Sequence, residues 1–373
     1  MRAIEQNVIN TYRYLHNHPE ISWHEFKTTA YIKEKLKEYC SKVITFKNYT
    51  GVIGEFGNFD GKRPVVGLRA DIDALWQEVE GKFKPNHSCG HDAHTAIILG
   101  VLWKLAEEKL LHDKVAIKFI FQPAEETGDG ALMMVQNHVI DNLDYLYGIH
   151  VRPYHETPMG VAAPVIIHGA AKNYEGVIKG EDAHGARPHL NLNAIEVGAQ
   201  IVNLLNQIHL DPTVPHSVKM TKFQAGGKSL NIIPGNASFG LDLRAQNNEL
   251  MTTLDKKVRE ILSTIANLYG ITIELTHEDY VPAAVLNDTA ISIMKKAIIE
   301  TIGESNMKPS ILTPGGDDFH FYSIKKPTLK ATMLGLGCDL RPGLHHPLMN
   351  LNEEALLIGV NILFQAIIKT YGL

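Results

Sequence analysis

Three imidazoles and one thiol lie close together in the segment HSCGHDAH, which spans residues 87–94. A single glycine separates Cys89 from His91, so both side chains can reach one metal ion from a turn. A further pair of imidazoles, His345 and His346, lies in the sequence GLHHP near the C-terminal end. A lone cysteine is more often a small buried apolar residue than a ligand. The neighbouring histidines, among 19 in the chain, make metal ligation the better interpretation.

Carboxylates and one more imidazole follow three apolar runs of the chain. They close the runs GLRADID, FIFQPAEE and LYGIH, and they are Asp71, Asp73, Glu125, Glu126 and His150. Runs this apolar are typical of buried parallel strands, whose carboxyl ends meet at one edge of a sheet. These polar residues are therefore predicted to converge in space. Asp71 and Asp73 could cap a helix, or equally could hold a ligand imidazole or a metal-bound water.

Two adjacent glutamates beside metal ions suit the hydrolysis of an amide or peptide bond. Adjacent acids usually lie in a solvated loop, but Glu125 and Glu126 end a buried run, so one could bind metal while the other accepts a proton. Two metals roughly 3.5–4 Å apart would share a water and lower its pKa toward neutrality. The free glutamate could take the proton and pass it to the departing amine. Attack of the water on the amide carbonyl creates an oxyanion, which needs hydrogen-bond donors or positive charge. His184 in AHGARPH, Asn231 and Arg244 could supply them.

Helices and apolar strands alternate at both ends of the chain. A long helix is predicted within residues 1–40, broken near His18-Pro19, and a buried helix over 353–371. The remaining expected elements are helices at 95–111 and 131–139 and strands at 64–68, 115–121, 145–149 and 328–336. This alternation favours an α/β domain built on a buried, mostly parallel sheet.

The middle of the chain has a different pattern. Two helices with one apolar face each are expected at 194–208 and 250–269. Four strands are expected around them, at 174–178, 218–223, 237–243 and 271–276. The order β-α-β-β-α-β is that of a split-βαβ, ferredoxin-like module. We therefore predict an α/β domain, residues 1–170 and 284–373, interrupted by an inserted α+β domain, residues 171–283.

Composition limits the class of protein. A chain of 373 residues exceeds what one hydrophobic core usually serves. The net charge of −5 gives no electrostatic reason to expect nucleic acid or an anionic membrane as a partner. No apolar run reaches the roughly 20 residues of a membrane helix, and the N-terminal residues do not resemble a signal peptide. Three scattered cysteines do not form a disulfide framework, so we expect a cytoplasmic location.

The motifs taken together resemble the M20 metallopeptidase family, in its amidohydrolase branch of aminoacylase, hippurate hydrolase and auxin-conjugate hydrolase type. The resemblance extends over essentially the whole chain, and the short segment before Cys89 makes it most similar to the bacterial AmhX-like amidohydrolases. The motifs, in order, are HNHPE, GLRADIDAL, SCGHDAHT, FQPAEE, GIHV, AHGARPH, NIIPG and LHHP. The resemblance implies a phosphorylase/hydrolase-like catalytic α/β domain with an inserted lid or dimerisation domain.

The resemblance also implies roles for individual residues. Glu125 would be the general base, and His184 would help to stabilise the oxyanion in the partner's site of a homodimer. Asn231 and Arg244 would lie near the substrate carboxylate or the oxyanion, and the loop that begins Gly315-Gly316 resembles the family's substrate-binding turn. Two divalent ions, Zn, Mn or Co, would be bound by Cys89, His91, Glu126, His150 and His345, with His345 preferred to His346.

The expected activity is that of a metal-dependent amidohydrolase acting on N-acyl amino acids or related amides. A dipeptidase or aminopeptidase with the same binuclear site is the alternative, and a non-catalytic metal-binding homologue is an alternative of another class. Two departures from the branch concern its lid and pocket rim. Trp76 replaces the usual proline, and Asn193-Ala194 stands where an aspartate is usual.

Overall fold

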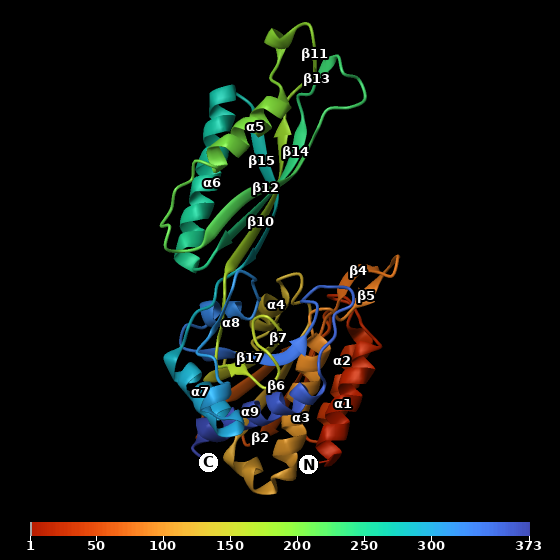
Figure 1. The fold of residues 1–373 in the computed structure, drawn as a ribbon, viewed down its shortest axis with the longest axis vertical. Helices are drawn as coiled ribbons and strands as arrows, with labels where there is room; N and C mark the ends of the chain where they lie inside the picture. The colour runs from red at the N-terminus through yellow and green to blue at the C-terminus, as the bar shows by residue number, and fades with distance from the viewer. Residues whose placement is uncertain (1) are drawn as a thin grey trace. The chain divides into compact units, whose positions relative to one another are not determined.

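The structure, a computed structural model, describes residues 2–373, which form two compact units (Figure 1). Met1, at the start of the predicted first helix and domain, lies outside the described residues. Unit 1 comprises the chain up to Ile167, together with Val285–Leu312 and Asp318–Leu373. Unit 2 comprises His168–Ala284 and Thr313–Asp317. The predicted division differs from this one at residues 168–170, 284 and 313–317, all of which belong to unit 2.

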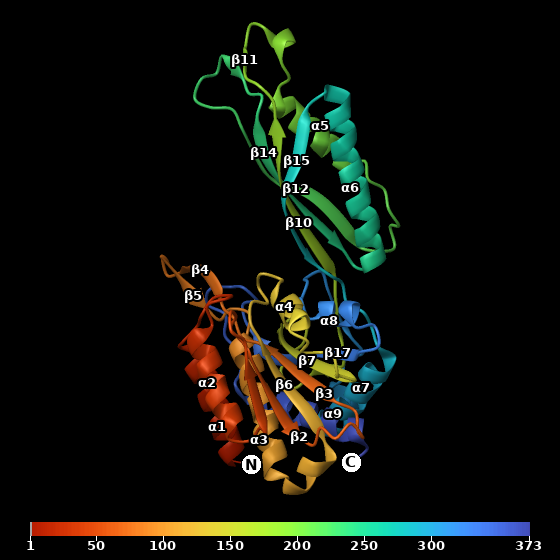
Figure 2. The same ribbon diagram turned by 180° about the vertical axis from the view of Figure 1, so that it is seen from behind.

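Unit 1 is built on a seven-stranded sheet with the strand order β1-β2-β6-β3-β7-β17-β8. The pairs β6–β3, β3–β7 and β7–β17 are parallel, whereas β1, β2 and β8 pair antiparallel to their neighbours. The sheet is therefore mixed, and the prediction of a mostly parallel sheet holds for its four central strands only. Figure 2 shows β2, β6 and β3 side by side. The strands are β1 (Lys42–Thr45), β2 (Val52–Gly57), β3 (Val66–Asp71), β6 (Ala116–Gln122), β7 (Tyr145–Pro153), β8 (Ala162–Ala163) and β17 (Lys330–Leu340).

Helices cover both faces of this sheet. Successive side chains of a strand point to opposite faces, and β7 shows the two sides: Ile149 lies against Gly359 of α9, and Gly148 lies against Phe319, which precedes α8. The helices on the Ile149 face are α1 (Arg2–His16), α2 (Phe26–Lys37), α3 (His91–Glu107), α7 (Asp288–Ile302) and α9 (Glu354–Tyr371). Those on the other face are α4 (Gly130–Gln136) and α8 (His320–Lys325).

Helix α9 is long and apolar enough, by length and composition alone, to cross a membrane. In this structure, however, its side chains lie in the core of unit 1. Leu356, Leu363 and Ile367 are fully buried in the same core as α3 and the sheet. The helix is apolar because it packs against α3, α7 and β17 within unit 1.

Helix α3 begins directly under the carboxyl ends of the central strands. Gly90, the residue before it, has φ +92, and a Cβ there would lie 2.4 Å from Val151 Cγ2 of β7. Only glycine accepts both the conformation and the close approach. This glycine lets the chain turn so that Cys89 and His91 face the same space.

A two-stranded hairpin, β4 (Leu75–Val79) and β5 (Lys82–Asn86), extends from unit 1 beside this edge (Figure 1). Its turn is Glu80-Gly81, where both residues have positive φ. Such a two-residue turn matches the twist of an antiparallel pair. The hairpin was not predicted, because Glu-Gly is not among the dipeptides, such as Asn-Gly and Asp-Gly, that are typical of a two-residue turn.

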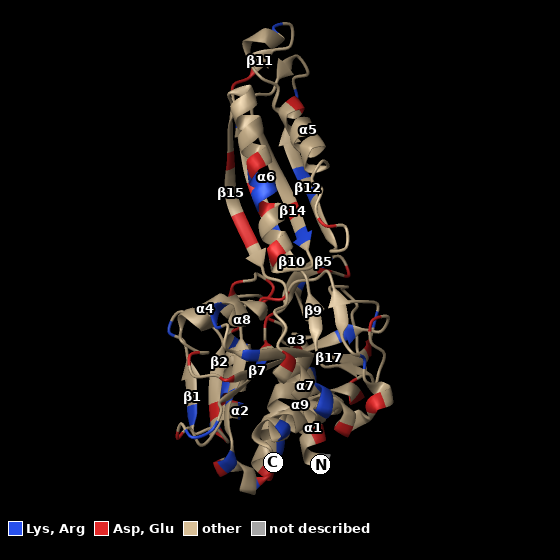
Figure 3. Ribbon diagram, turned by 90° about the vertical axis from the view of Figure 1, so that its left-hand side faces the viewer, with Lys and Arg blue, Asp and Glu red and all other residues tan. Residues whose placement is uncertain are grey.

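Unit 2 is a four-stranded antiparallel sheet, in the order β12-β14-β10-β15, with two helices packed on it. Helix α6 carries charges of both signs, and strand β15 carries acidic residues (Figure 3). Asp255 of α6 pairs with Lys172 and Arg259. A short pair, β11 and β13, lies at one end. The elements are β10 (Ala170–Lys179), β11 (Ala183–His184), α5 (Ala194–Leu205), β12 (His216–Ala225), β13 (Ile232–Ile233), β14 (Ala237–Ala245), α6 (Asn248–Tyr269) and β15 (Thr272–Val281). A further small pair is β9 (Ile166–His168) with β16 (Ile311–Thr313).

Candidate metal centre

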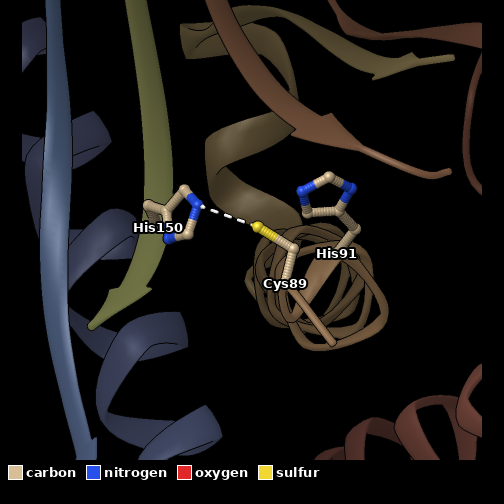
Figure 4. A group of neighbouring side chains, drawn as sticks. All are labelled: Cys89, His91 and His150. Carbon is tan, nitrogen blue, oxygen red and sulfur yellow. Dashed lines mark hydrogen bonds between the residues drawn. The ribbon is translucent and has the colours of Figure 1, made fainter. Parts of the chain in front are cut away.

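The five predicted ligands lie together at the carboxyl edge of the unit 1 sheet. They form overlapping groups, in each of which the possible ligand atoms lie within 4.8 Å of one another. In Figure 4, Cys89 and His150 point toward each other, with Cys89 Sγ 3.6 Å from His150 Nε2. The groups are Cys89 with His91 and His150, Cys89 with Glu126 and His345, and His91 with Glu125 and Glu126.

The five side chains reach this space from four parts of the fold. Cys89 precedes α3 and His91 is its first residue, while His150 belongs to β7. Glu126 follows β6, and His345 lies in the loop after β17. The parallel central strands bring these positions together, as the sequence predicts.

The ring of His91 is oriented for ligation. Its Nδ1 lies 2.9 Å from the backbone oxygen of Asp73, so this nitrogen donates, and Nε2 is the nitrogen that can bind a metal ion. His91 Nε2 lies 3.8 Å from Glu125 Oε2 and 3.8 Å from Glu126 Oε1.

Two polar atoms at the centre are buried without a hydrogen bond. Within residues 2–373, no hydrogen bond reaches His91 Nε2 or Glu126 Oε1. Unpartnered buried polar atoms are costly and rare, and a bound cation satisfies both at once. The donor set of one sulfur, imidazoles and a carboxylate fits Zn²⁺, Mn²⁺ or Co²⁺.

The structure distinguishes the two histidines near the C-terminus. His345 Nε2 lies 3.6 Å from Glu126 Oε1, inside one of the ligand groups. His346 Nδ1 instead accepts a hydrogen bond from the backbone N–H of Leu348, at 3.1 Å. His345, and not His346, therefore lies among the other predicted ligands.

Electrostatics at the centre favour a cation. Burial raises the pKa of Glu126 to about 7. Burial, followed by the charge of Glu126, raises the pKa of the Cys89 thiol well above its usual value. Burial opposes protonation of His91, but the charge of Asp71 and the contacts with Cys89 and Asp73 together outweigh burial and raise the pKa of that imidazole. The side chains thus retain protons that a metal ion would displace.

Asp73 holds the backbone of the Glu125-Glu126 pair. Its two carboxylate oxygens accept the backbone N–H groups of these residues, at 3.1 and 3.0 Å, and Ser22 Oγ donates to the second oxygen at 2.7 Å. It caps no helix. Of the two roles considered from the sequence, the contacts match the support of a ligand.

Asp71 belongs to a buried polar network behind the centre. It lies 2.6 Å from His94 Nδ1 and 2.6 Å from Arg69 Nη1. His94 Nε2 accepts the backbone N–H of Val151, so the proton of this ring is on Nδ1 and both nitrogens are used. Arg69 also donates to Asp318, at 2.8 Å.

Arg69 and Asp318 were not identified from the sequence, and His94 was noted only as one of the imidazoles of the HSCGHDAH segment. Arg69 was detectable, because a charged residue within the buried run VGLRAD requires partners. Asp318 lies 249 residues further along the chain, and no spacing in the sequence links the two.

The predicted residues of unit 2 fall into two sets. His184 is exposed in β11 and pairs in register with Ile232, and the N–H of Gly185 donates to the backbone oxygen of Asn231 at 2.7 Å. His184 and Asn231 are thus neighbours at the end of unit 2 where β14 begins.

Arg244, Gly315 and Gly316 lie at the other end of unit 2. Arg244 is next to the last residue of β14 and pairs with Asp242, Nη2 to Oδ2 at 2.7 Å. It lines a cavity of about 200 Å³ with Gly169 and Pro314, and the N–H of Gly169 donates to the backbone oxygen of Gly315. Because β14 has nine residues, its ends are about 25 Å apart. A small molecule cannot touch both sets in one copy of unit 2.

Comparison with known proteins gives a consistent result. The model of peptidase family M20/M25/M40 matches residues 67–369. The chain is 31% identical to N-acetylcysteine deacetylase of Bacillus subtilis (96% of this chain, 95% of the relative). It is 32% identical to thermostable carboxypeptidase 2 of Saccharolobus solfataricus (88% and 85%). The structure superposes on the Bacillus subtilis YXEP protein, described as a dinuclear metal-binding peptidase of family M20, with a TM-score of 0.83, 28% identity and coverage of 100% and 99%. This chain belongs to peptidase family M20/M25/M40 and is a metal-dependent amide hydrolase.

Proposed function

We propose that this protein hydrolyses the amide bond of N-acyl amino acids, with Glu125 as the general base. The observation that carries the proposal is the gathering of five donor side chains around Glu125, with His91 Nε2 and Glu126 Oε1 buried and unbonded. A site with these features and a carboxylate beside it has the components of metal-assisted amide hydrolysis.

Cys89, His91, Glu126, His150 and His345 would hold two divalent ions, Zn, Mn or Co. Bound there, the ions would supply Lewis acidity toward the amide oxygen and acidify water. The dinuclear description of the superposed relative supports the number of ions. Asp73 holds the backbone of the two glutamates by hydrogen bonds, and Asp71 accepts a hydrogen bond from the imidazole of His94 behind them.

Glu125 would move the proton. Its Oε2 lies 3.8 Å from His91 Nε2, and its side chain retains some exposure at the rim of the centre. From this position the carboxylate can accept a proton from attacking water and deliver it to the departing amine. The leaving group then departs as a neutral amine.

We further propose a homodimer formed through unit 2, as an inserted lid and dimerisation domain. The sheet of unit 2 ends in β12 and β15, whose outer edges can pair with a second copy. The separation of His184 and Asn231 from Arg244, Gly315 and Gly316 supports two copies at each site. Arg244 and the glycine turn would bind substrate in their own chain, while His184 and Asn231 would reach the oxyanion in the partner's site.

The relatives support N-acyl amino acids as substrates, since the deacetylase removes an acetyl group from an amino acid. The similarity to a carboxypeptidase supports the alternative of a peptidase with the same centre. The three cysteines are free thiols, and one of them is a proposed ligand, which supports a reducing, cytoplasmic location.

The test combines metal analysis with a substrate panel. The purified protein, loaded with Mn²⁺, Co²⁺ or Zn²⁺, is assayed on N-acetyl and N-benzoyl amino acids and on free dipeptides. We expect two metal ions per chain and faster hydrolysis of N-acyl amino acids. Preference for dipeptides would favour the peptidase. Two bound metals without hydrolysis of any amide would favour a non-catalytic homologue.

A further inference from the structure

The backbone of His345 is held on both sides by elements outside its own loop. The residue has φ +63, a left-handed conformation that is uncommon outside glycine. Its N–H donates to the backbone oxygen of Ser88, at 2.6 Å. Its carbonyl oxygen accepts a hydrogen bond from Gln77 Nε2, at 3.0 Å. A residue in such a conformation keeps it only where its surroundings fix it.

The amide of Gln77 is oriented by a second amide. Asn86 Nδ2 donates to Gln77 Oε1 at 2.7 Å and also to the backbone oxygen of Pro347 at 3.0 Å. Because Gln77 Oε1 accepts this bond, the NH₂ end of the Gln77 amide is the end that faces His345. The hairpin β4–β5 is thereby bonded to the loop on both sides of His345-His346.

The register of the hairpin shows which of its side chains lie on the same face as Gln77. Gln77 lies opposite Lys84, and Leu75 lies opposite Asn86, so these four side chains share one face. Trp76 lies on the opposite face and is 57% exposed. Lys84 is exposed although it faces the same way as Gln77. Gln77 and Asn86 are therefore the residues through which the hairpin bonds to the His345 loop.

We propose that Gln77 is a positioning residue for metal binding, which holds His345 so that its imidazole reaches the centre. The inference rests on the proposed role of His345 as a ligand. His345 Nε2 lies 3.6 Å from Glu126 Oε1 in this conformation. The bond to Ser88 fixes one side of the residue next to Cys89, and the bond to Gln77 fixes the other. Losing the second bond frees the carbonyl to rotate and moves the ring away.

The test compares Gln77→Ala with Lys84→Ala, its matched control on the same face of the same hairpin. Both proteins are stripped of metal and titrated with Co²⁺ against a competing chelator, and the visible absorption of bound Co²⁺ is recorded. We expect Gln77→Ala to lower the affinity for one of the two ions by about 10- to 100-fold and to leave the affinity for the other unchanged. Lys84→Ala should bind both as the parent does. The unfolding temperature of the metal-free variants should match that of the metal-free parent.

A double variant shows whether the effect passes through His345. His345→Ala alone should lower the affinity for the same ion, and adding Gln77→Ala to it should cause no further loss of affinity. Gln77→Met, which keeps the length but cannot donate, should reproduce the loss and serves if the alanine variant does not fold.

The outcomes separate the two proposals. Full binding of both ions by Gln77→Ala and Gln77→Met, with a loss in His345→Ala, would overturn the positioning role and leave the ligand assignment standing. Full binding by His345→Ala would overturn the ligand assignment itself. Additive losses in the double variant would show that Gln77 acts by another route and would also overturn the inference.

Discussion

The backbone N–H of Glu126 donates a hydrogen bond of 3.0 Å to Asp73 Oδ2, across 53 residues of sequence. The N–H of Glu125 donates to the other oxygen of the same carboxylate. One buried side chain therefore sets the backbone of both the proposed base and a proposed ligand. Asp73 also faces His91, whose Nδ1 lies 3.3 Å from Asp73 Oδ1.

Asp73→Asn should lower metal affinity by about 10- to 100-fold. An asparagine presents one oxygen and one NH₂ group, so one of the two backbone N–H groups meets a donor in place of an acceptor. The measurement is a competition titration of the metal-free protein. Ser22→Ala is the control, because it removes a donor to Asp73 and leaves both backbone bonds in place. Parent-like affinity in Asp73→Asn would contradict the assigned role.

Glu125→Gln and Glu126→Gln should fail in different ways, although the residues are adjacent. Glu125→Gln should keep both metal ions and lose roughly 10²- to 10⁴-fold in kcat, because only proton transfer is removed. Glu126→Gln should lose metal, since it removes a charged donor atom from the centre. Metal content and kcat measured on the same samples distinguish the two effects. A Glu125→Gln protein as active as the parent would exclude Glu125 as the base.

The sequence predicts the features that depend on local patterns, and it does not predict contacts between residues that are distant along the chain. The positions of Glu126 and His150 follow from apolar runs and from the rule that parallel strands share a carboxyl edge, whereas Cys89 was identified from the histidines beside it. The antiparallel strands were missed because β1 and β8 have only four and two residues and because Gly54 and Glu55 interrupt the apolar run of β2. Helix α7 was not predicted, although Asn287 caps its first turn.

The supporting contacts could not be predicted. Asp73 to Glu126 and Gln77 to His345 each join residues that are distant in sequence, and no periodicity relates them. The types of the ligands are visible in the sequence because metal chemistry restricts them. The groups that orient the ligands can be any donor or acceptor, so only the fold identifies them.

Because of Glu25, the free energy of unfolding should fall as pH rises. The side chain is fully buried, accepts the backbone N–H of Ala124 and a bond from Thr50 Oγ1, and burial raises its pKa from 4.5 to about 7. Since the folded chain holds this proton more tightly than the unfolded chain, the stabilisation is complete below pH 4.5 and is lost as pH rises through 7. A shift of this size corresponds to roughly 3 kcal/mol.

Glu25→Gln should remove this part of the pH dependence, because an amide can still accept from Ala124 and donate to Thr50. Urea unfolding of the metal-free proteins at pH 5 and pH 8 gives the comparison. Glu34→Gln, at an exposed position of α2, is the control and should follow the parent. Equal pH dependence in Glu25→Gln and the parent would contradict the assignment to Glu25.

Two inactive variants should restore activity to each other if His184 acts in the partner's site. His184→Ala lacks the residue in unit 2, and Glu125→Gln lacks the base in unit 1, so each homodimer is defective at both sites. In a mixed dimer, one site combines an intact Glu125 with the intact His184 of the other chain. When the variants are unfolded together and refolded, half of the dimers are mixed and half of their sites are intact, so activity should return to about a quarter of the parent value. A mixture as inactive as its components, with dimers present in sedimentation, would show that His184 serves its own chain or takes no part. A monomer in sedimentation at micromolar concentration would overturn the dimer itself.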